Sequence, residues 1–322
     1  MTTRKTRKSR KKLRIIKPVW LIIIILAFLI TIFLYLSSPI ETKKTLYIPK
    51  GTINSIISQL SKDGYDVGII DMLALRFIGI PKSGWRDIGQ NKMSRIDFLY
   101  KLTSTRSMIY KITLIPGKTT YIFFKKLAKD LDLNASKLQE AYDALSKYPE
   151  AGIYADTYHL PYGIKEKNLI SYLLNVSERK YKQLSIKAYG DYNQSIWLRT
   201  LTIASIIQKE AANYQEMPLV ASVIYNRLEK NMRLQMDGTL NYGKYAHTKV
   251  TPKRIIEDNT TFNTYKYKGL PPSPIGAVGS HAINAAINPA KTDFLYFMRN
   301  KEGVHDFTDT FRKHRKNIEK VR

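Results

Sequence analysis

The chain contains no cysteine among its 322 residues. A disulfide framework, a cysteine-ligated zinc site and a cysteine nucleophile are therefore excluded. Histidine is also scarce, and the five histidines do not show the H-E-x-x-H spacing or a comparable metal-ligand pattern. The sequence also lacks a glycine-rich phosphate loop with its lysine. We therefore expect neither a metal ion nor an organic cofactor.

Acidic residues are few. The chain has 26 aspartates and glutamates and 53 lysines and arginines, which gives a net charge of +27. A basic surface is typical of proteins that bind an anionic partner. A general bias toward lysine in the source proteome would give the same composition. Charge alone also suggests a nucleic-acid binder, but no nucleic-acid recognition motif occurs, and we expect no such partner.

Charge is absent from the run between Pro18 and Ile40, most of which is isoleucine, leucine and phenylalanine. About 20 apolar residues are enough to span a bilayer as a helix. Residues 1–17 carry nine basic side chains and no acidic one, which favours a cytoplasmic N-terminus. A cleaved signal peptide is the rival interpretation, but the run is long and no A-x-A site follows it. We predict a basic cytoplasmic tail (1–17), a transmembrane helix (18–38) and an extracytoplasmic remainder on a single-pass protein of the cell (inner) membrane.

The remainder divides into a polar linker (39–44), a small α+β unit (45–112) and a larger mixed α/β unit (113–322). A hydrophobic content of 44% is enough for real cores. Residues 46–52 and 114–119 are similar: each predicts a short strand, a Pro/Gly turn and a threonine N-cap before an amphipathic helix. Periodicity predicts further helices, and the fold class is α+β. The expected helices lie near residues 71–77, 94–103, 120–131, 135–147, 165–183, 195–213, 218–230 and 308–320.

Glu210 stands out because it lies on the apolar stripe of its own helix. At 100° per residue, Ile203, Ile206 and Ile207 project within about 60° of Glu210, whereas Gln208 points nearly the opposite way. Burial raises the pKa of a carboxyl group and keeps part of it protonated near neutrality, as a general acid requires. A glutamate that simply reaches solvent from the helix end, or pairs with an arginine, fits the same pattern.

Several polar side chains follow Glu210 along the chain. Tyr225, Asn226 and Arg227 lie near the end of the next helix, where such residues usually serve packing or capping. Alternation in residues 233–243 predicts a strand and turn that present three polar side chains on one side. A proline-rich, irregular loop is expected over residues 268–275. The three side chains of the predicted strand are Gln235, Asp237 and Thr239.

These segments contain six ordered motifs. They are IxxKE (206–210), PLVASVxYNRL (218–228), RLQxDxT (233–239), YG (242–243), NTYxYxGLPPxPI (263–275) and NPAKTDFLYF (288–297). In order and spacing they resemble the YceG-like (MltG) family of endolytic lytic transglycosylases of peptidoglycan. The resemblance extends over about residues 45–312, and the small unit resembles the LysM-like subdomain of that family.

The resemblance implies that Glu210 is the catalytic residue. It also implies a substrate-binding set, which consists of Tyr225, Asn226, Arg227, Gln235, Asp237, Thr239, Asn263, Thr264 and Tyr265. The chain departs from the family pattern at three positions: Gln208, where many members have Glu; Gly238, where a proline is usual; and Ala155, where the usual P-D-T-Y begins with proline. Gly238 leaves the conformation of its turn open.

A single carboxylate is sufficient for the chemistry that the resemblance implies. Ordinary glycosidases use two carboxylates. A lytic transglycosylase cleaves the MurNAc-GlcNAc β-1,4 bond with the substrate's own 6-hydroxyl, so one group can act first as acid and then as base. The implied partners are glycan strands and peptidoglycan synthases, and the implied role is to terminate strand elongation. Two alternatives remain: a hydrolytic muramidase with Asp237 as second carboxylate, and a non-enzymatic glycan-binding scaffold for wall synthesis.

Overall fold

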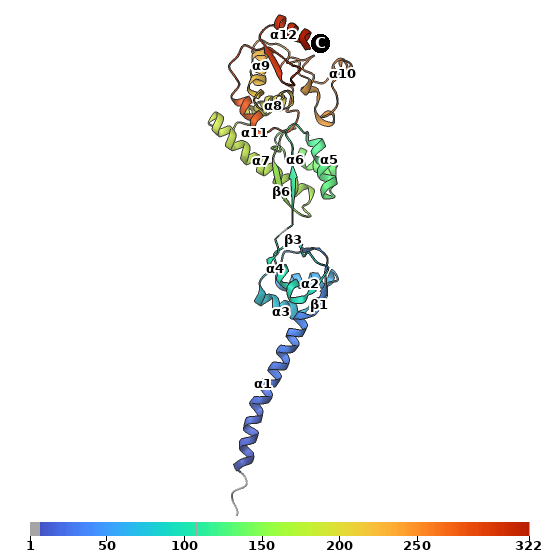
Figure 1. The fold of residues 1–322 in the computed structure, drawn as a ribbon, viewed down its shortest axis with the longest axis vertical. Coiled ribbons are helices and arrows are strands. Elements are labelled where there is room, and N and C mark those ends of the chain that lie inside the picture. Colours follow the sequence, from blue (N-terminus) through green and yellow to red (C-terminus); the bar gives the residue numbers. More distant parts are fainter. Residues whose placement is uncertain (1–6, 107, 322) are drawn as a thin grey trace, which may run out of the picture. The chain divides into compact units, whose positions relative to one another are not determined.

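The structure is a computed structural model that describes residues 7–106 and 108–321. Residues 1–6 of the expected basic tail lie outside the described residues. The chain folds as two compact units, Met1–Ile109 and Tyr110–Arg322, which are described separately (Figure 1). The division falls at the start of strand β5 (Ile109–Thr113), so residues 110–112, which the sequence assigned to the small unit, belong to the larger one.

The first unit begins with the long helix α1 (Arg7–Ser37). Among the described residues, its segment Val19–Ser37 is the one stretch of helix long and apolar enough to span a membrane. Large apolar side chains along it are exposed, for example Trp20 and Phe33. Exposure of this kind is stable only where the surroundings are lipid rather than water.

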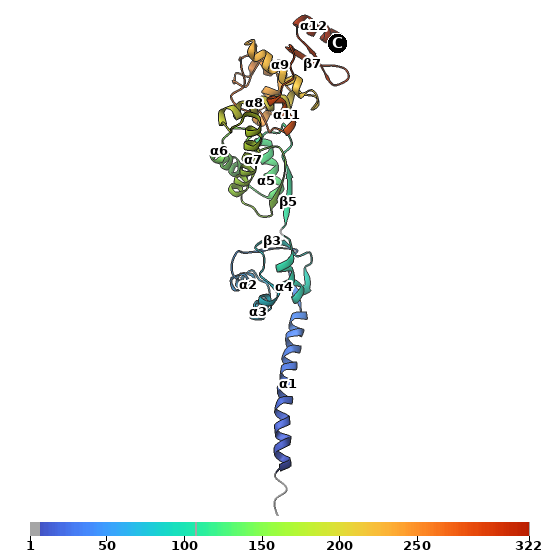
Figure 2. The same ribbon diagram turned by 90° about the vertical axis from the view of Figure 1, so that its left-hand side faces the viewer.

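The rest of the first unit is a small α+β fold. Two antiparallel strand pairs, β1 with β4 and β2 with β3, lie beside three helices (Figure 2). Strands β1, β2 and β4 and the three helices contribute side chains to one apolar core. Residues 39–41 form β1 and pair with β4, so the first half of the polar linker expected over 39–44 is instead a strand. The elements are β1 (Pro39–Glu41), β2 (Thr45–Ile48), α2 (Ile53–Lys62), α3 (Ile69–Ile78), β3 (Gly84–Asp87), β4 (Lys92–Ser94) and α4 (Arg95–Ser104).

The second unit contains two apolar cores. The first lies under the strand pair of β5 and β6 and the helices packed on it. Thr119 caps α5 by accepting a hydrogen bond from Ile122 N, as the Pro/Gly–Thr pattern predicted. The elements of this part are α5 (Thr120–Leu131), α6 (Ala135–Leu145), β6 (Thr157–Pro161) and α7 (Glu166–Tyr189).

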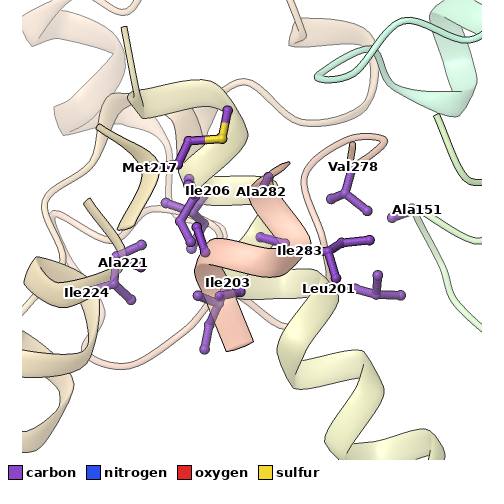
Figure 3. Packing of buried hydrophobic residues seen from close by; sticks show 14 of the residues in the cluster. Ala151, Leu201, Ile203, Ile206, Met217, Ala221, Ile224, Val278, Ala282 and Ile283 are labelled. Atoms are coloured by element: carbon purple, nitrogen blue, oxygen red, sulfur yellow. The ribbon is translucent and has the colours of Figure 1, made fainter. Parts of the chain in front are cut away.

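The second core lies around helix α8, which packs against α9 and α11. Figure 3 shows Leu201, Ile203 and Ile206 of α8 together with side chains of the other two helices. A hairpin of β7 and β8 and an outer helix, α12, follow. The elements are α8 (Gln194–Glu210), α9 (Met217–Glu229), the 3-10 turns η1 (Asp237–Leu240) and η2 (Gly243–Tyr245), α10 (Pro252–Glu257), α11 (Ser280–Ile287), β7 (Tyr296–Arg299), β8 (His305–Thr308) and α12 (Phe311–Val321).

The strand predicted within residues 233–243 is wrong. Residues 233–236 are irregular, and Asp237–Leu240 form the 3-10 turn η1. Thr239 is fully buried and donates to the carbonyl of Met236 at 2.7 Å, whereas Gln235 and Asp237 are exposed. The three side chains therefore do not share one side of a strand.

Candidate active site

Helix α8 ends at Glu210 and fixes that side chain. Asn193 caps the start of the helix by accepting hydrogen bonds from Ser195 N and Ile196 N. Ile206 and Ile207, in its last turns, are completely buried in the second core. Because the helix is held along its length, the partly buried carboxylate at its last residue has a defined position.

The carboxylate of Glu210 has a backbone partner in η1. Gly238 N donates to Glu210 Oε1 at 2.6 Å. Burial raises the pKa of Glu210 to about 7, and the neighbouring Asp237 raises it further, while the Gly238 N–H and Lys209 act in the lowering direction. The group is therefore divided between its two protonation states near neutrality, which is the condition for an acid that must also serve as a base.

Gly238 is required by space as well as by its N–H. A Cβ atom at this position would lie 2.7 Å from Glu210 Oε1 and 2.9 Å from the Cβ of Lys209. Any side chain would push the carboxylate or the turn away. The departure from the usual proline thus has a structural reason here: the turn is a 3-10 turn whose second residue donates a hydrogen bond to Glu210.

Two cations hold the other end of η1. Lys209 Nζ donates to the carbonyl of Asn241. Arg254 donates to the carbonyl of Leu240 and to Asn241 Oδ1, the latter at 3.2 Å. Lys209 and Glu210 are consecutive residues of α8, so one helix end contacts both ends of the same turn. Cationic groups at the carbonyl end of a helical turn also interact favourably with its dipole.

Tyr265 and Asp237 complete the exposed side of the site. Tyr265 Oη donates to Asp237 Oδ1 at 2.6 Å. Burial and the bond to Asp237 raise the pKa of Tyr265, and the charge of Glu210 acts in the same direction. The structure therefore brings Asp237 and Tyr265 beside Glu210.

Three of the predicted residues are buried behind the turn η1 and Tyr265: Thr239, Asn263 and Thr264. Thr264 Oγ1 accepts from Met236 N at 3.1 Å and lies 2.9 Å from Thr239 Oγ1. Asn263 Oδ1 accepts from Tyr265 N at 3.1 Å. In this structure these side chains bond to the chain itself, so they set the position of η1 and of Tyr265.

Tyr225 and Asn226 bond away from Glu210. Tyr225 Oη donates to the carbonyl of Ala286 in α11 at 2.7 Å. Asn226 Nδ2 donates to the carbonyl of Thr292 at 2.7 Å. The two bonds attach α9 to α11 and to the segment after α11. This is the packing role that the residues alone suggested.

Arg227 is buried and bonds to backbone carbonyls. Its Nε donates to Leu295 O at 2.6 Å and its Nη1 donates to Leu234 O at 2.8 Å. The Oε1 atom of Gln235 lies 3.4 Å from the same Nη1. Gln235 itself has a φ of 51°, in the left-handed region, and its side chain is exposed. Arg227 thus fixes the segment that leads into η1.

Sequence reasoning missed a second buried carboxyl group, Glu150. It accepts from Thr120 N at 3.1 Å, from Thr120 Oγ1 at 3.0 Å and from Ala151 N at 3.2 Å. Burial raises its pKa to about 7, and the charge of Lys209 acts against that rise. Burial in turn lowers the pKa of Lys209 to about 8, while Glu150 and Glu210 raise it. Lys209 is thus electrostatically linked to both carboxyl groups.

His305 and Gln208 contact groups other than Glu210. His305 Nδ1 lies 2.7 Å from Glu216 Oε2, and His305 N donates to Glu216 Oε1 at 2.9 Å. Gln208 accepts from Gly279 N at 3.3 Å, on a segment other than the one that contacts Glu210.

Comparison with known proteins agrees with the motifs. The profile of the YceG-like family matches residues 46–320. The endolytic murein transglycosylase of Bacillus subtilis (strain 168) is 41% identical over 122 residues, which are 38% of this chain and 34% of that protein. The protein of the same name from Streptococcus pneumoniae (strain R6) is 30% identical over 174 residues, 49% of this chain and 30% of the relative.

The matched segments thus span about a third of the length of these curated relatives. A crystal structure of a YceG-like protein from Listeria monocytogenes covers far more: 86% of this chain and 99% of that one, at 26% identity and a TM-score of 0.55. Since the family profile extends over nearly all of the chain beyond α1, the chain belongs to the YceG-like family.

Proposed function

We propose that the chain is an endolytic lytic transglycosylase of peptidoglycan, which cleaves the MurNAc-GlcNAc β-1,4 bond within glycan strands and leaves a 1,6-anhydroMurNAc end. The observation that carries this proposal is Glu210: a carboxyl group fixed at a helix end, with a pKa of about 7. The names of the curated relatives, endolytic murein transglycosylases, supply the substrate class.

In the first step, protonated Glu210 donates its proton to the glycosidic oxygen as the bond from that oxygen to C1 breaks. The leaving saccharide departs with a new hydroxyl group. Because the folded protein keeps a substantial share of Glu210 protonated near neutrality, the acid is available without help from a metal ion. The positive charge that develops on the sugar ring faces the carboxylate that remains.

In the second step, the 6-hydroxyl of the same MurNAc residue attacks C1, and ionised Glu210 accepts its proton. The new O6–C1 bond closes the anhydro ring, no water is consumed, and Glu210 returns to its protonated form. The Gly238 N–H stabilises the ionised state between the two steps, because a hydrogen bond to a charged acceptor is about twice as strong as one between neutral groups.

Asp237 is the observation that favours a second candidate, a hydrolytic muramidase. Its carboxylate lies next to Gly238 and is oriented by Tyr265 Oη, so it could activate a water molecule. Mass spectrometry of glycan strands digested by the full-length protein separates the two functions. Anhydro ends are expected; reducing ends would instead establish the muramidase. Complete absence of cleavage, with glycan binding retained, would favour the non-enzymatic scaffold.

The proposed residue roles follow from the contacts. Glu210 is the catalytic group, and Asp237 and Tyr265, exposed or partly exposed beside it, contact the sugar. Gln235, exposed two residues before Asp237, is a further contact to the glycan. Tyr225, Asn226, Arg227, Thr239, Asn263 and Thr264 position the substrate site through backbone bonds. The first unit, with its resemblance to a LysM-like subdomain, binds glycan without cutting it. Peptidoglycan synthases remain the proposed protein partners, and termination of strand elongation the proposed role.

A further inference from the structure

Helix α3 of the first unit is apolar on its outward side as well as on its inward side. Leu75 and Asp71 are completely buried on the inward side, whereas Ile69 is 73% exposed and Phe77 is 92% exposed on the outward side. At 100° per residue, the four outward apolar residues lie within an arc of about 100°. Water-soluble proteins expose apolar side chains singly more often than as one continuous face. The face, called here the α3 face, consists of Ile69, Ile70, Leu73 and Phe77 together with Ile80 just beyond the helix.

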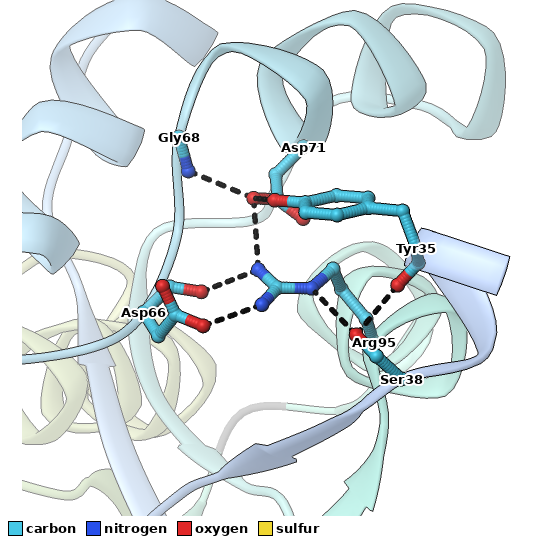
Figure 4. Close-up of polar contacts among 6 residues, drawn as sticks. All are labelled: Tyr35, Ser38, Asp66, Gly68, Asp71 and Arg95. Carbon is cyan, nitrogen blue, oxygen red and sulfur yellow. Dashed lines mark hydrogen bonds and ion pairs between the residues drawn. The ribbon is translucent and has the colours of Figure 1, made fainter. Parts of the chain in front are cut away.

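A buried polar network fixes α3 to the outer end of α1 (Figure 4). Tyr35 Oη donates to Asp71 Oδ2 at 2.7 Å, and Arg95 Nη1 donates to the same oxygen at 3.1 Å. The guanidinium of Arg95 also lies 4.3 Å from the centre of the Tyr35 ring. Gly68 N donates to Asp71 Oδ2 at 2.7 Å, which holds the first turn of α3 in the same network.

The network also fixes the depth of α3. Tyr35 belongs to the candidate span Val19–Ser37, two residues before its end. At 1.5 Å per residue, the Cα of Tyr35 lies about 3 Å before the end of the span. Because its Oη donates to Asp71, helix α3 lies near the level at which the span ends. Leu36 packs against the core of the same unit. Figures 1 and 2 both show α3 on the side of the unit from which α1 emerges.

We propose that the α3 face is inserted into the headgroup region of the membrane that α1 spans, so that the first unit contacts the bilayer at a second point. The occupant of this face is lipid, because the face lies beside the end of a membrane span. Arg76, exposed in the last turn of α3, suits the phosphate groups found at that depth. Helices of this kind bury their apolar face roughly 5–10 Å into the boundary between headgroups and acyl chains.

Fluorescence quenching in liposomes tests the proposal on the full-length protein. The chain has no cysteine, so Phe77→Cys provides a single labelling site for an environment-sensitive dye. Tyr47→Cys is the matched control: Tyr47 is an aromatic residue, 49% exposed, on β2, whose partner β3 lies on the side of the unit opposite α1. We use vesicles of phosphatidylcholine and phosphatidylglycerol that contain a nitroxide-labelled lipid.

We expect a nitroxide near the headgroup to quench the dye at Phe77 several-fold more than the dye at Tyr47. A nitroxide at the end of the acyl chain should quench it less, because the helix lies at the boundary and does not span the membrane. Both substituted side chains are exposed, so the label does not disturb the core, and a thermal melt confirms the fold. Ile69→Cys gives an independent second site with the same expected result.

Two outcomes would overturn the proposal. If a water-soluble quencher reaches the dye at Phe77 as readily as the dye at Tyr47, the α3 face is in water. If the dye is protected from that quencher but is not reached by either nitroxide lipid, protein covers the face, for instance a second copy of the chain.

Discussion

Glu210 is the residue on which the proposed activity depends, and its replacement by glutamine is the most direct test. Glu210→Gln keeps the size of the side chain and an oxygen to accept the Gly238 N–H, but it cannot exchange a proton. General acid–base groups contribute typically about 10²–10⁴-fold in rate. Because one residue serves in both steps, we expect a loss at or beyond the upper end of that range, measured as the release of anhydro ends.

Two variants control for this experiment. Glu229→Gln makes the same chemical change at an exposed position of α9 and should retain full activity. Gln208→Ala removes only the bond to Gly279 N and should retain most activity. A folded Glu210→Gln protein with near wild-type rates would refute the mechanism, and Asp237 would be the next candidate.

The raised pKa values of Glu150 and Glu210 also predict how stability depends on pH. Both values are about 7 in the fold against an ordinary value of 4.5, so folding favours the protonated forms. Their contribution to stability is fully present below about pH 4.5 and is lost as the pH rises through about 7. We expect the melting temperature of the second unit to fall over this window, and to fall less steeply in Glu210→Gln. Equal slopes in the two proteins would contradict the assigned pKa of Glu210.

At the scale of the element, η1 is the part of the site most sensitive to a small change. Gly238→Ala places a Cβ where Glu210 Oε1 is only 2.7 Å away. The carboxylate or the turn must shift, and a displacement of about 1 Å at a reacting group can cost about 10²-fold in rate. We expect a loss of that order together with a lower melting temperature, because the Cβ of Lys209, 2.9 Å away, cannot move without its backbone. Gly190→Ala is the control. Its left-handed φ of 81° strains an alanine, so the melting temperature should fall, but a Cβ there meets open space and the activity of the folded protein should remain.

Lys209 acts on the same element from its other end. Lys209→Met removes the bond to Asn241 O and the positive charge that lowers the pKa of Glu210. The pKa of Glu210 should then rise, so the fall in kcat/KM on the alkaline side should move to higher pH as the maximal rate drops. Lys209→Arg keeps the positive charge, so the alkaline fall in kcat/KM should return part of the way toward its wild-type pH. An unchanged pH profile in Lys209→Met would show that Lys209 serves the fold alone.

At the scale of the whole molecule, the charge asymmetry around α1 predicts its orientation. Nine basic residues precede the span, and the positive-inside rule then places the second unit outside the cytoplasm, where peptidoglycan lies. A reporter that is active only outside the cytoplasm, fused after the last residue, should be active. The matched fusion of a reporter active only in the cytoplasm should be silent, and the opposite pair of results would reverse the assigned topology.

The sequence was sufficient to predict the elements whose stability is local. Helix α5, with its Thr119 cap, and helix α8, with the buried isoleucines that precede Glu210, follow from periodicity and capping. The strand expected near Asp237 failed because η1 is held by distant groups, namely Thr264, Lys209 and Arg254, which no local pattern contains. Glu150 was missed for the same reason: its partner Thr120 lies 30 residues earlier in the chain.

The contact between α8 and η1 has a consequence for turnover. Protonation of Glu210 weakens its hydrogen bond from Gly238, because a charge-assisted bond becomes a neutral one. The stiffness of η1 and the charge of Glu210 are therefore linked, and such linkage is reciprocal. A glycan strand that rests on Asp237 and steadies the turn would draw Glu210 toward its ionised form, and loss of the strand would let it recover its proton. In the proposed mechanism, the acidity of Glu210 therefore responds to occupancy, and bound product would delay the return of Glu210 to its protonated form before the next cleavage.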